Sequence, residues 1–92
     1  MIRSFRSKAL REYFETGSPR RLSVPNTARV GRILRGLDDA ERPEDMSLPG
    51  LRFHPLKGAD RGRYALDVSG NWRITFGWSK TDATDVDLED YH

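Results

Sequence analysis

The spacing of apolar residues changes near residue 50 of this 92-residue chain. Before that point, apolar residues recur every three or four positions, which is typical of amphipathic helices. After it, apolar and polar residues alternate, which is typical of strands with one buried face. The pattern therefore predicts helices mainly in the first half and a sheet in the second.

The first half is predicted to contain one short strand and two helices. Residues 1–5, MIRSF, mix apolar Ile2 and Phe5 with polar residues and predict an opening strand. Residues 8–15, KALREYFE, form an apolar face at helical spacing, with Ser7 as a candidate cap. The sequence GSP that follows ends this helix.

A second helix is predicted to begin near Pro25 and Asn26 and to end at Leu37. Asp38 and Asp39 come next, and carboxylates are unfavourable at the C-terminal end of a helix dipole, so we expect the helix to stop before them. Residues 41–50, ERPEDMSLPG, are polar, contain two prolines and predict a loop.

The second half is predicted to contain four strands. Residues 72–78 alternate regularly and are joined to residues 62–68 by the turn SGN, which predicts a hairpin. The four predicted strands are 51–56, 62–68, 72–78 and 85–91. One strand and two helices followed by four strands predict a single α+β domain over residues 1–92, with the helices packed on one face of an antiparallel-rich sheet.

Composition narrows the setting of this domain. Hydrophobic residues make up 36% of the chain and charged residues 33%, so the core must be thin. The chain has no cysteine, which excludes disulfides and thiolate chemistry and suits a reducing compartment. It shows neither the apolar run of a signal peptide nor a stretch long enough to span a membrane. We therefore expect a cytoplasmic protein with no membrane partner.

The net charge of +2 hides an uneven distribution. Residues 1–36 carry nine basic and two acidic side chains, whereas residues 37–92 carry seven basic and twelve acidic ones. An arginine-rich surface favours a polyanion such as RNA, although a solvated helix surface explains the charge equally well. The candidate RNA-binding residues in this part are Arg20, Arg21, Arg29, Arg32 and Arg35.

Several reactive side chains fall at outward positions or ends of the predicted strands. If the strands are neighbours, one patch can collect His54, Lys57, Arg73, Asp90, Tyr91 and His92. Such a set suits RNA cleavage by the 2′-hydroxyl, which needs a base, an acid and cations around the phosphate. That chemistry requires no metal or cofactor, and the two histidines lack metal-ligand spacing. Taken singly, each residue is equally compatible with an ordinary surface role.

The stretch LRFHPLKGADRGRYALDVSGNWRITFGW and the closing VDLEDYH resemble the HigB branch of the RelE-type bacterial toxins. The resemblance extends from MIRSF to His92 and is densest over residues 51–92. It implies a toxin that enters the ribosomal A site and cleaves messenger RNA during translation. It also implies a helix-turn-helix antitoxin of the HigA type, which binds the toxin and represses their shared operon.

Carried over to this chain, the resemblance implies an active site of the same six residues, with the last strand holding the terminal DYH in place. His92 or Asp90 would take the 2′ proton, and Arg73 and Lys57 would hold the phosphate. Tyr91 would then orient the nucleotide, while His54 would act as acid or as a positioning group. These assignments leave the pairing of acid and base open.

Two other functions remain compatible with the sequence. One is a non-catalytic RNA-binding module of the same fold, which would need the arginines but not the terminal DYH. The other is a ribonuclease that acts on free RNA without the ribosome. A further open point is Asn71, which suits a turn but could also contact an adenine next to the cleaved bond.

Overall fold

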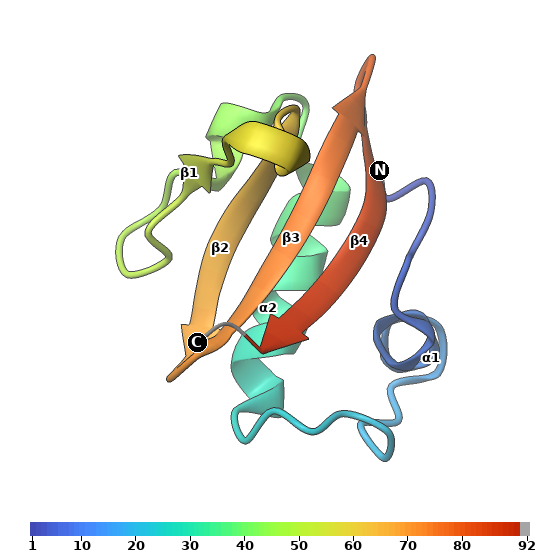
Figure 1. Cartoon of the computed structure of the whole chain (residues 1–92). Helices are drawn as coiled ribbons and strands as arrows, with labels where there is room; N and C mark the ends of the chain where they lie inside the picture. The colour runs from blue at the N-terminus through green and yellow to red at the C-terminus, as the bar shows by residue number, and fades with distance from the viewer. Residues whose placement is uncertain (91–92) are drawn as a thin grey trace.

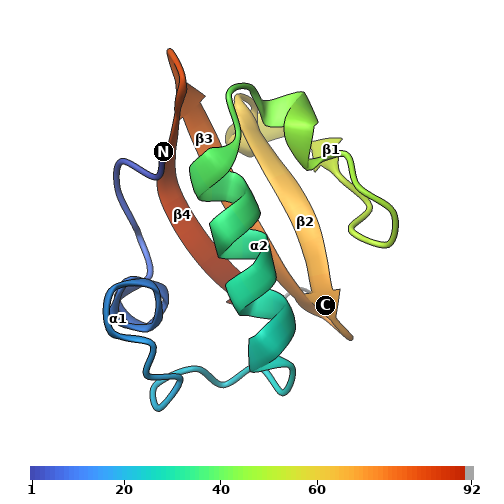
Figure 2. The same ribbon diagram turned by 180° about the vertical axis from the view of Figure 1, so that it is seen from behind.

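The computed structural model describes residues 1–90 and shows a four-stranded antiparallel sheet in the order β1-β2-β3-β4 (Figure 1). Its strands are β1 (His54–Pro55), β2 (Arg63–Ser69), β3 (Trp72–Ser79) and β4 (Asp82–Asp90). Its helices are α1 (Lys8–Thr16), α2 (Thr27–Asp39) and two short 3₁₀ helices, η1 (Pro43–Met46) and η2 (Gly58–Asp60). Helix α2 crosses one face of the sheet, and α1 lies beside it near β4 (Figure 2). The predicted α+β class is confirmed.

Local hydrogen bonds explain where the two α-helices begin. The Ser7 hydroxyl accepts a hydrogen bond from the Leu10 amide at 3.1 Å, and the Asn26 side chain accepts one from the Arg29 amide at 3.1 Å. Both are N-caps of the predicted kind. Helix α1 ends at Gly17, whose φ of 80° is a left-handed conformation that glycine adopts without strain.

Helix α2 is longer than predicted, because it includes Asp38 and Asp39. The expected stop at Leu37 is therefore wrong. The Asp38 carboxylate accepts a hydrogen bond from the Ile2 backbone amide at 2.8 Å. This contact with the N-terminal segment offsets the unfavourable interaction of the carboxylate with the helix dipole.

The opening strand predicted over residues 1–5 is present only as two isolated parallel bridges to β4, Ile2 with Ala83 and Phe5 with Val86. Between the bridges, the backbone of Asp85 has a positive φ of 47°, and its amide donates to the Ser4 hydroxyl at 2.9 Å. This irregularity in β4 interrupts the ladder, so the segment pairs with β4 without forming a continuous strand.

The predicted hairpin is confirmed as β2 and β3, but two other strands have different bounds. The strand expected over 51–56 is reduced to His54–Pro55, because Arg52 has a left-handed φ of 50° that breaks the extended chain. The strand expected over 85–91 begins earlier, at Asp82, and is described to Asp90. Its early part continues past the irregularity at Asp85, which hid it from a simple alternation pattern.

The core lies between α2 and the sheet. Helix α2 contributes Val30, Ile33, Leu34 and Leu37, and the sheet contributes Leu66, Ile74, Phe76 and Val86. Neither α1 nor α2 covers the other face of the sheet (Figure 1), and this open face carries the candidate site. No helix within residues 1–90 is long and apolar enough to cross a membrane.

Candidate active site

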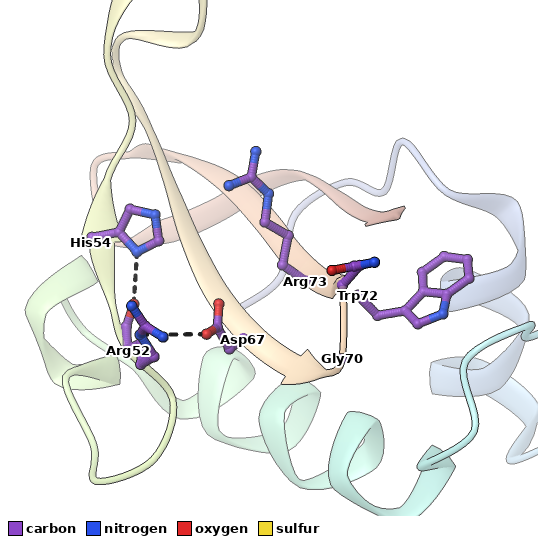
Figure 3. A pocket seen from close by; sticks show the side chains of 7 residues that line it. Arg52, His54, Asp67, Gly70, Trp72 and Arg73 are labelled. Atoms are coloured by element: carbon purple, nitrogen blue, oxygen red, sulfur yellow. Dashed lines mark hydrogen bonds and ion pairs between the residues drawn. The ribbon is translucent and has the colours of Figure 1, made fainter. Parts of the chain in front are cut away.

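A pocket of about 300 Å³ lies at the end of the open face where β2 turns into β3. The residues that line it are Arg52, His54, Asp67, Gly70, Asn71, Trp72 and Arg73. Figure 3 shows the side chains of His54, Asp67 and Arg73 rising from the same face of the sheet, away from α2. The structure thus brings together three of the predicted residues, His54, Asn71 and Arg73.

Arg73 is held in the middle of a row that runs across three strands. The pairing register places Asp67 of β2 and Glu89 of β4 directly opposite it on either side. Directly opposed residues in antiparallel strands have Cβ atoms roughly 4.5–5.5 Å apart. The guanidinium therefore stands on a rigid central strand between two carboxylate-bearing neighbours, in a position to meet an anion from the open side.

The imidazole of His54 is oriented by its own backbone neighbour. Nδ1 lies 2.7 Å from the carbonyl oxygen of Arg52, and a carbonyl can only accept. Nδ1 therefore carries the hydrogen and donates it (Figure 3). In neutral His54 this leaves Nε2 with the lone pair, and in protonated His54 Nε2 carries the second hydrogen. One nitrogen is thus available to take a proton or to give one.

Arg52 links both sides of the pocket. Its Nε lies 3.6 Å from a carboxylate oxygen of Asp67, while its carbonyl holds His54. It also adopts a left-handed φ of 50°, which costs about 1 kcal/mol for a residue with a side chain. The strained backbone turns the Arg52 carbonyl toward the His54 ring, and this orientation is a reason for the strain to persist.

The remaining predicted catalytic residues have different positions. Lys57 is exposed at the start of η2 and does not line the pocket. Asp90 ends β4 opposite Trp72, next to the pocket residue Arg73, but is not among the lining residues either. Tyr91 and His92 lie outside the described residues, so the predicted roles of both stay predictions.

Most of the predicted RNA-binding arginines lie away from the pocket. Arg32 and Arg35 are exposed on α2, which covers the opposite face of the sheet (Figure 2). Arg20 and Arg21 are exposed in the segment between α1 and α2, where Arg21 Nε lies 3.7 Å from the Glu12 carboxylate. Contact of these four with RNA stays a prediction.

Arg29 has an internal structural contact that the sequence did not suggest. Its guanidinium donates to the carbonyl oxygen of Gly50 at 2.6 Å and to that of Asp67 at 3.5 Å. It therefore ties α2 to the segment before β1 and to the end of β2. A role for Arg29 in RNA binding also stays a prediction.

Two charged pocket residues, Arg52 and Asp67, were missed from the sequence. Asp67 occupies an outward position of its strand, so pairing 62–68 with 72–78 in register could have placed it beside Arg73. No comparable signal marks Arg52, because its position depends on a left-handed backbone at a non-glycine residue. No group of three or more His, Asp or Glu side chains in the described part of the chain is arranged to hold a metal ion.

Comparisons with known proteins agree on one family. The family model described as "RelE-like toxin of type II toxin-antitoxin system HigB" matches residues 3–92. The chain is 35% identical over 92 residues to Endoribonuclease HigB of Proteus vulgaris, covering 100% of both chains. It is also 31% identical over 81 residues to Toxin HigB-1 of Vibrio cholerae serotype O1, covering 85% of this chain and 84% of that protein.

Proposed function

The chain belongs to the HigB-like toxins of type II toxin–antitoxin systems, and from this premise we propose that it is a ribosome-dependent endoribonuclease that cleaves messenger RNA in the A site. Membership of the family implies an antitoxin as partner. Full-length identity of 35% to a protein named Endoribonuclease HigB supports RNA cleavage as the reaction. The observation that carries the proposal is the pocket in which His54 and Arg73 meet.

The reaction we assign is an internal transesterification, in which the phosphorus moves from the 5′-oxygen to the 2′-oxygen of the RNA. The 2′-oxygen loses its proton to a base and bonds to the adjacent phosphorus. The bond from phosphorus to the 5′-oxygen breaks, and that oxygen takes a proton from an acid. The products are a 2′,3′-cyclic phosphate and a 5′-hydroxyl, so no water is consumed in this step.

The pocket residues suit two parts of this chemistry. Arg73 can donate two parallel hydrogen bonds to phosphate oxygens and stabilise the charge that develops on them. His54 Nε2 can act as an acid in the protonated ring or as a base in the neutral ring. Because the Arg52 carbonyl fixes Nδ1, Nε2 is the nitrogen presented for proton transfer. In the proposed assignment, Asp90 or His92 takes the 2′ proton, Lys57 contacts the phosphate and Tyr91 orients the nucleotide.

The distribution of charge supports dependence on the ribosome. The outer strand β4 is acidic, with five carboxylates at Asp82, Asp85, Asp87, Glu89 and Asp90, and the last two lie at the end of β4 that pairs with the pocket residues Trp72 and Arg73. Arg32 and Arg35 lie on the opposite side of the molecule, on α2. A ribonuclease that binds free RNA unaided is expected to have its basic surface next to the active site. In this proposal, ribosomal RNA would contact the side of the molecule formed by α2, and the ribosome would deliver the messenger RNA to the pocket.

The antitoxin we propose is a helix-turn-helix protein of the HigA type, which neutralises this toxin and represses the operon. The proposed substrate places the toxin in the cytoplasm, where translation occurs. Within the pocket, Asn71 lies beside Arg73, and we assign it a contact with a base next to the cleaved bond. Mapping the cut sites of Asn71→Ala tests this: an unchanged sequence profile leaves Asn71 as a turn residue only.

The decisive experiment compares one messenger RNA under two conditions, free in solution and bound to translating ribosomes. Purified toxin is added to each, and the new 5′ ends are mapped by primer extension. We expect cuts within the codon in the A site only when ribosomes translate. Cuts of equal number on free RNA would contradict ribosome dependence, and the absence of cuts in both conditions would contradict the proposed reaction.

A further inference from the structure

A chain of hydrogen bonds crosses the open face of the sheet outside the pocket. Thr75 lies on β3, two residues after Arg73, and its side chain is fully buried. Its hydroxyl oxygen lies 3.1 Å from a guanidinium nitrogen of Arg63 on β2 and 2.5 Å from a carboxylate oxygen of Glu89 on β4. The buried hydroxyl joins an arginine to a carboxylate, and all three groups are partly or fully withdrawn from water, which strengthens their hydrogen bonds.

The direction of both hydrogen bonds follows from the groups themselves. A guanidinium can only donate, so Arg63 donates to the Thr75 oxygen. The single hydrogen of the Thr75 hydroxyl is then free to be donated to Glu89, whose carboxylate accepts. Arg63 also donates to the carbonyl oxygen of Asp85 at 2.8 Å, at the irregular point of β4. These hydrogen bonds therefore fix both the position of the Glu89 carboxylate and the course of the β4 backbone.

The Arg63 side chain lies next to a glycine of the neighbouring strand. Gly77 is the register partner of Arg63 on β3, and a Cβ built on it would lie 2.8 Å from the Thr84 hydroxyl oxygen and 3.7 Å from Arg63 Nη1. A Cβ at position 77 would clash with the Thr84 hydroxyl, whereas its distance from Arg63 is that of an ordinary van der Waals contact. Burial lowers the pKa of Arg63, and the nearby charge of Arg6 lowers it further, which is consistent with a guanidinium drawn onto the sheet rather than extended into water.

Glu89 connects this chain to the proposed active site, because the register places it directly opposite Arg73. We infer that Thr75 and Arg63 are positioning residues for RNA cleavage: they hold the Glu89 carboxylate beside Arg73, and Glu89 in turn orients the guanidinium for the scissile phosphate. This inference rests on the proposed function. It assigns a role to residues that contact neither substrate nor the proton-transfer groups.

The first test is Thr75→Val, which keeps the shape of the side chain and removes its hydroxyl. We expect kcat for ribosome-bound messenger RNA to fall by about ten- to a hundredfold, with KM nearly unchanged, because the substrate still binds but the guanidinium is misplaced. Thr75→Ser retains the hydroxyl and should restore most of the rate. Thr84→Val makes the same chemical change on the same face of the sheet, at a residue outside the chain of hydrogen bonds. This variant should cleave like wild type.

A double-mutant cycle separates positioning from a general loss of structure. Arg73→Lys is the second mutation, chosen because it keeps a positive charge but loses the fork-shaped donor. If Thr75 acts through Arg73, Thr75→Val should reduce kcat in the wild-type background and have little further effect in the Arg73→Lys background. Equal reductions in both backgrounds, or no reduction in either, would overturn the inference.

A spectroscopic measurement tests the same inference without relying on cleavage. In ¹⁵N-labelled full-length protein, the Nε–H group of Arg73 should be rigid on the nanosecond timescale in wild type and Thr75→Ser, and mobile in Thr75→Val. Equal rigidity in all three proteins would overturn the positioning role. This outcome is distinct from failure of the proposed function, which would appear as a wild-type toxin that cuts no RNA although its Arg73 is rigid.

Discussion

His54 and Arg73 reach one pocket from strands that do not touch, since β2 lies between β1 and β3. Neighbouring strands lie about 4.8 Å apart, so the two backbones are separated by roughly 10 Å. That separation leaves room for a nucleotide phosphate between a proton-transfer group and a cation. Because both strands belong to one sheet, the spacing is set by backbone hydrogen bonds rather than by flexible loops.

Arg73→Ala should abolish toxicity while leaving the protein folded. Arg73 points to the open face and contributes no side chain to the apolar core. Loss of a preorganised donor to a developing phosphate charge typically lowers the rate by about a hundred- to a thousandfold. Growth inhibition and cleavage of ribosome-bound messenger RNA measure the effect, and circular dichroism confirms folding. A folded Arg73→Ala protein with full toxicity would refute its role.

The roles of the Arg52 side chain and of the Arg52 backbone carbonyl can be tested separately. Arg52→Gly removes the guanidinium but tolerates the left-handed φ of 50° and keeps the carbonyl that orients His54. We expect it to retain most of the cleavage activity and to lose little stability, because relief of about 1 kcal/mol of backbone strain opposes the loss of the contact with Asp67.

Arg52→Pro is the matched opposite, since proline fixes φ near −65° and cannot keep this conformation. It should lose most of the activity even where thermal unfolding shows a folded protein, because the carbonyl no longer faces His54. Equal activity of the Gly and Pro variants would mean that the Nδ1 contact does not matter for cleavage.

The exposed arginines and Arg29 should behave differently when replaced with glutamine. Replacing Arg20, Arg21, Arg32 and Arg35 together should weaken binding to ribosomes and flatten its dependence on salt, with the cut sites unchanged. Arg29→Gln should instead lower the melting temperature, because it removes the donor to the Gly50 carbonyl. Sedimentation with ribosomes and thermal melting distinguish the two effects. If the fourfold variant binds ribosomes as wild type does, these four arginines do not contact ribosomal RNA and are ordinary solvent-exposed residues.

Asp45 should make stability depend on pH in the acidic range. A hydrogen bond from the Glu41 backbone amide, with further contributions from Arg42, lowers the pKa of Asp45 below its ordinary value. Because the folded pKa is depressed, the stabilisation is present above the unfolded pKa and is lost as the pH falls through the folded value. Asp45→Asn should therefore melt at a lower temperature than wild type at pH 7, and the difference should shrink as the solution is acidified. A constant difference across this range would exclude the carboxylate charge as its source.

Deletion of Tyr91 and His92 tests the proposed role of the chain end. All the core residues of β4 precede Asp90, so the deletion is expected to change stability by about half a kcal/mol or less. We expect a folded protein that no longer cleaves messenger RNA but still binds its antitoxin. A large drop in melting temperature would show that the tail serves folding instead, and full activity would show that it is idle.

Much of the fold could be predicted from local patterns, because caps and alternation act over a few residues. Ser7, Asn26 and the turn before Trp72 each predicted an element boundary within a residue or two. The errors arose where distant segments meet. Asp38 stays helical because of Ile2, and the irregularity at Asp85 is stabilised by Ser4. Neither contact leaves a trace in the neighbouring sequence.

In the candidate site too, features set by local sequence could be predicted, whereas features set by distant segments could not. Outward positions on a regular hairpin predicted that Arg73 would face the open side, and the position of His54 at the end of its predicted strand placed it in the same patch. The Arg52 carbonyl and the buried state of Thr75 could not be predicted, because the first depends on a left-handed backbone and the second on coverage by Arg63 and Glu89 from two other strands.

The carboxylates of β4 also affect how copies of the toxin meet one another. Within residues 1–90, the N-terminal segment pairs with the outer edge of β4 only as far as Val86, and beyond it the edge carries Asp87, Glu89 and Asp90. A strand edge without a backbone partner can recruit the same edge of a second molecule and start aggregation. Here that pairing would place like charges opposite each other, which is unfavourable in a sheet. The acidic end of β4 thus favours a toxin that stays soluble when it accumulates without its antitoxin.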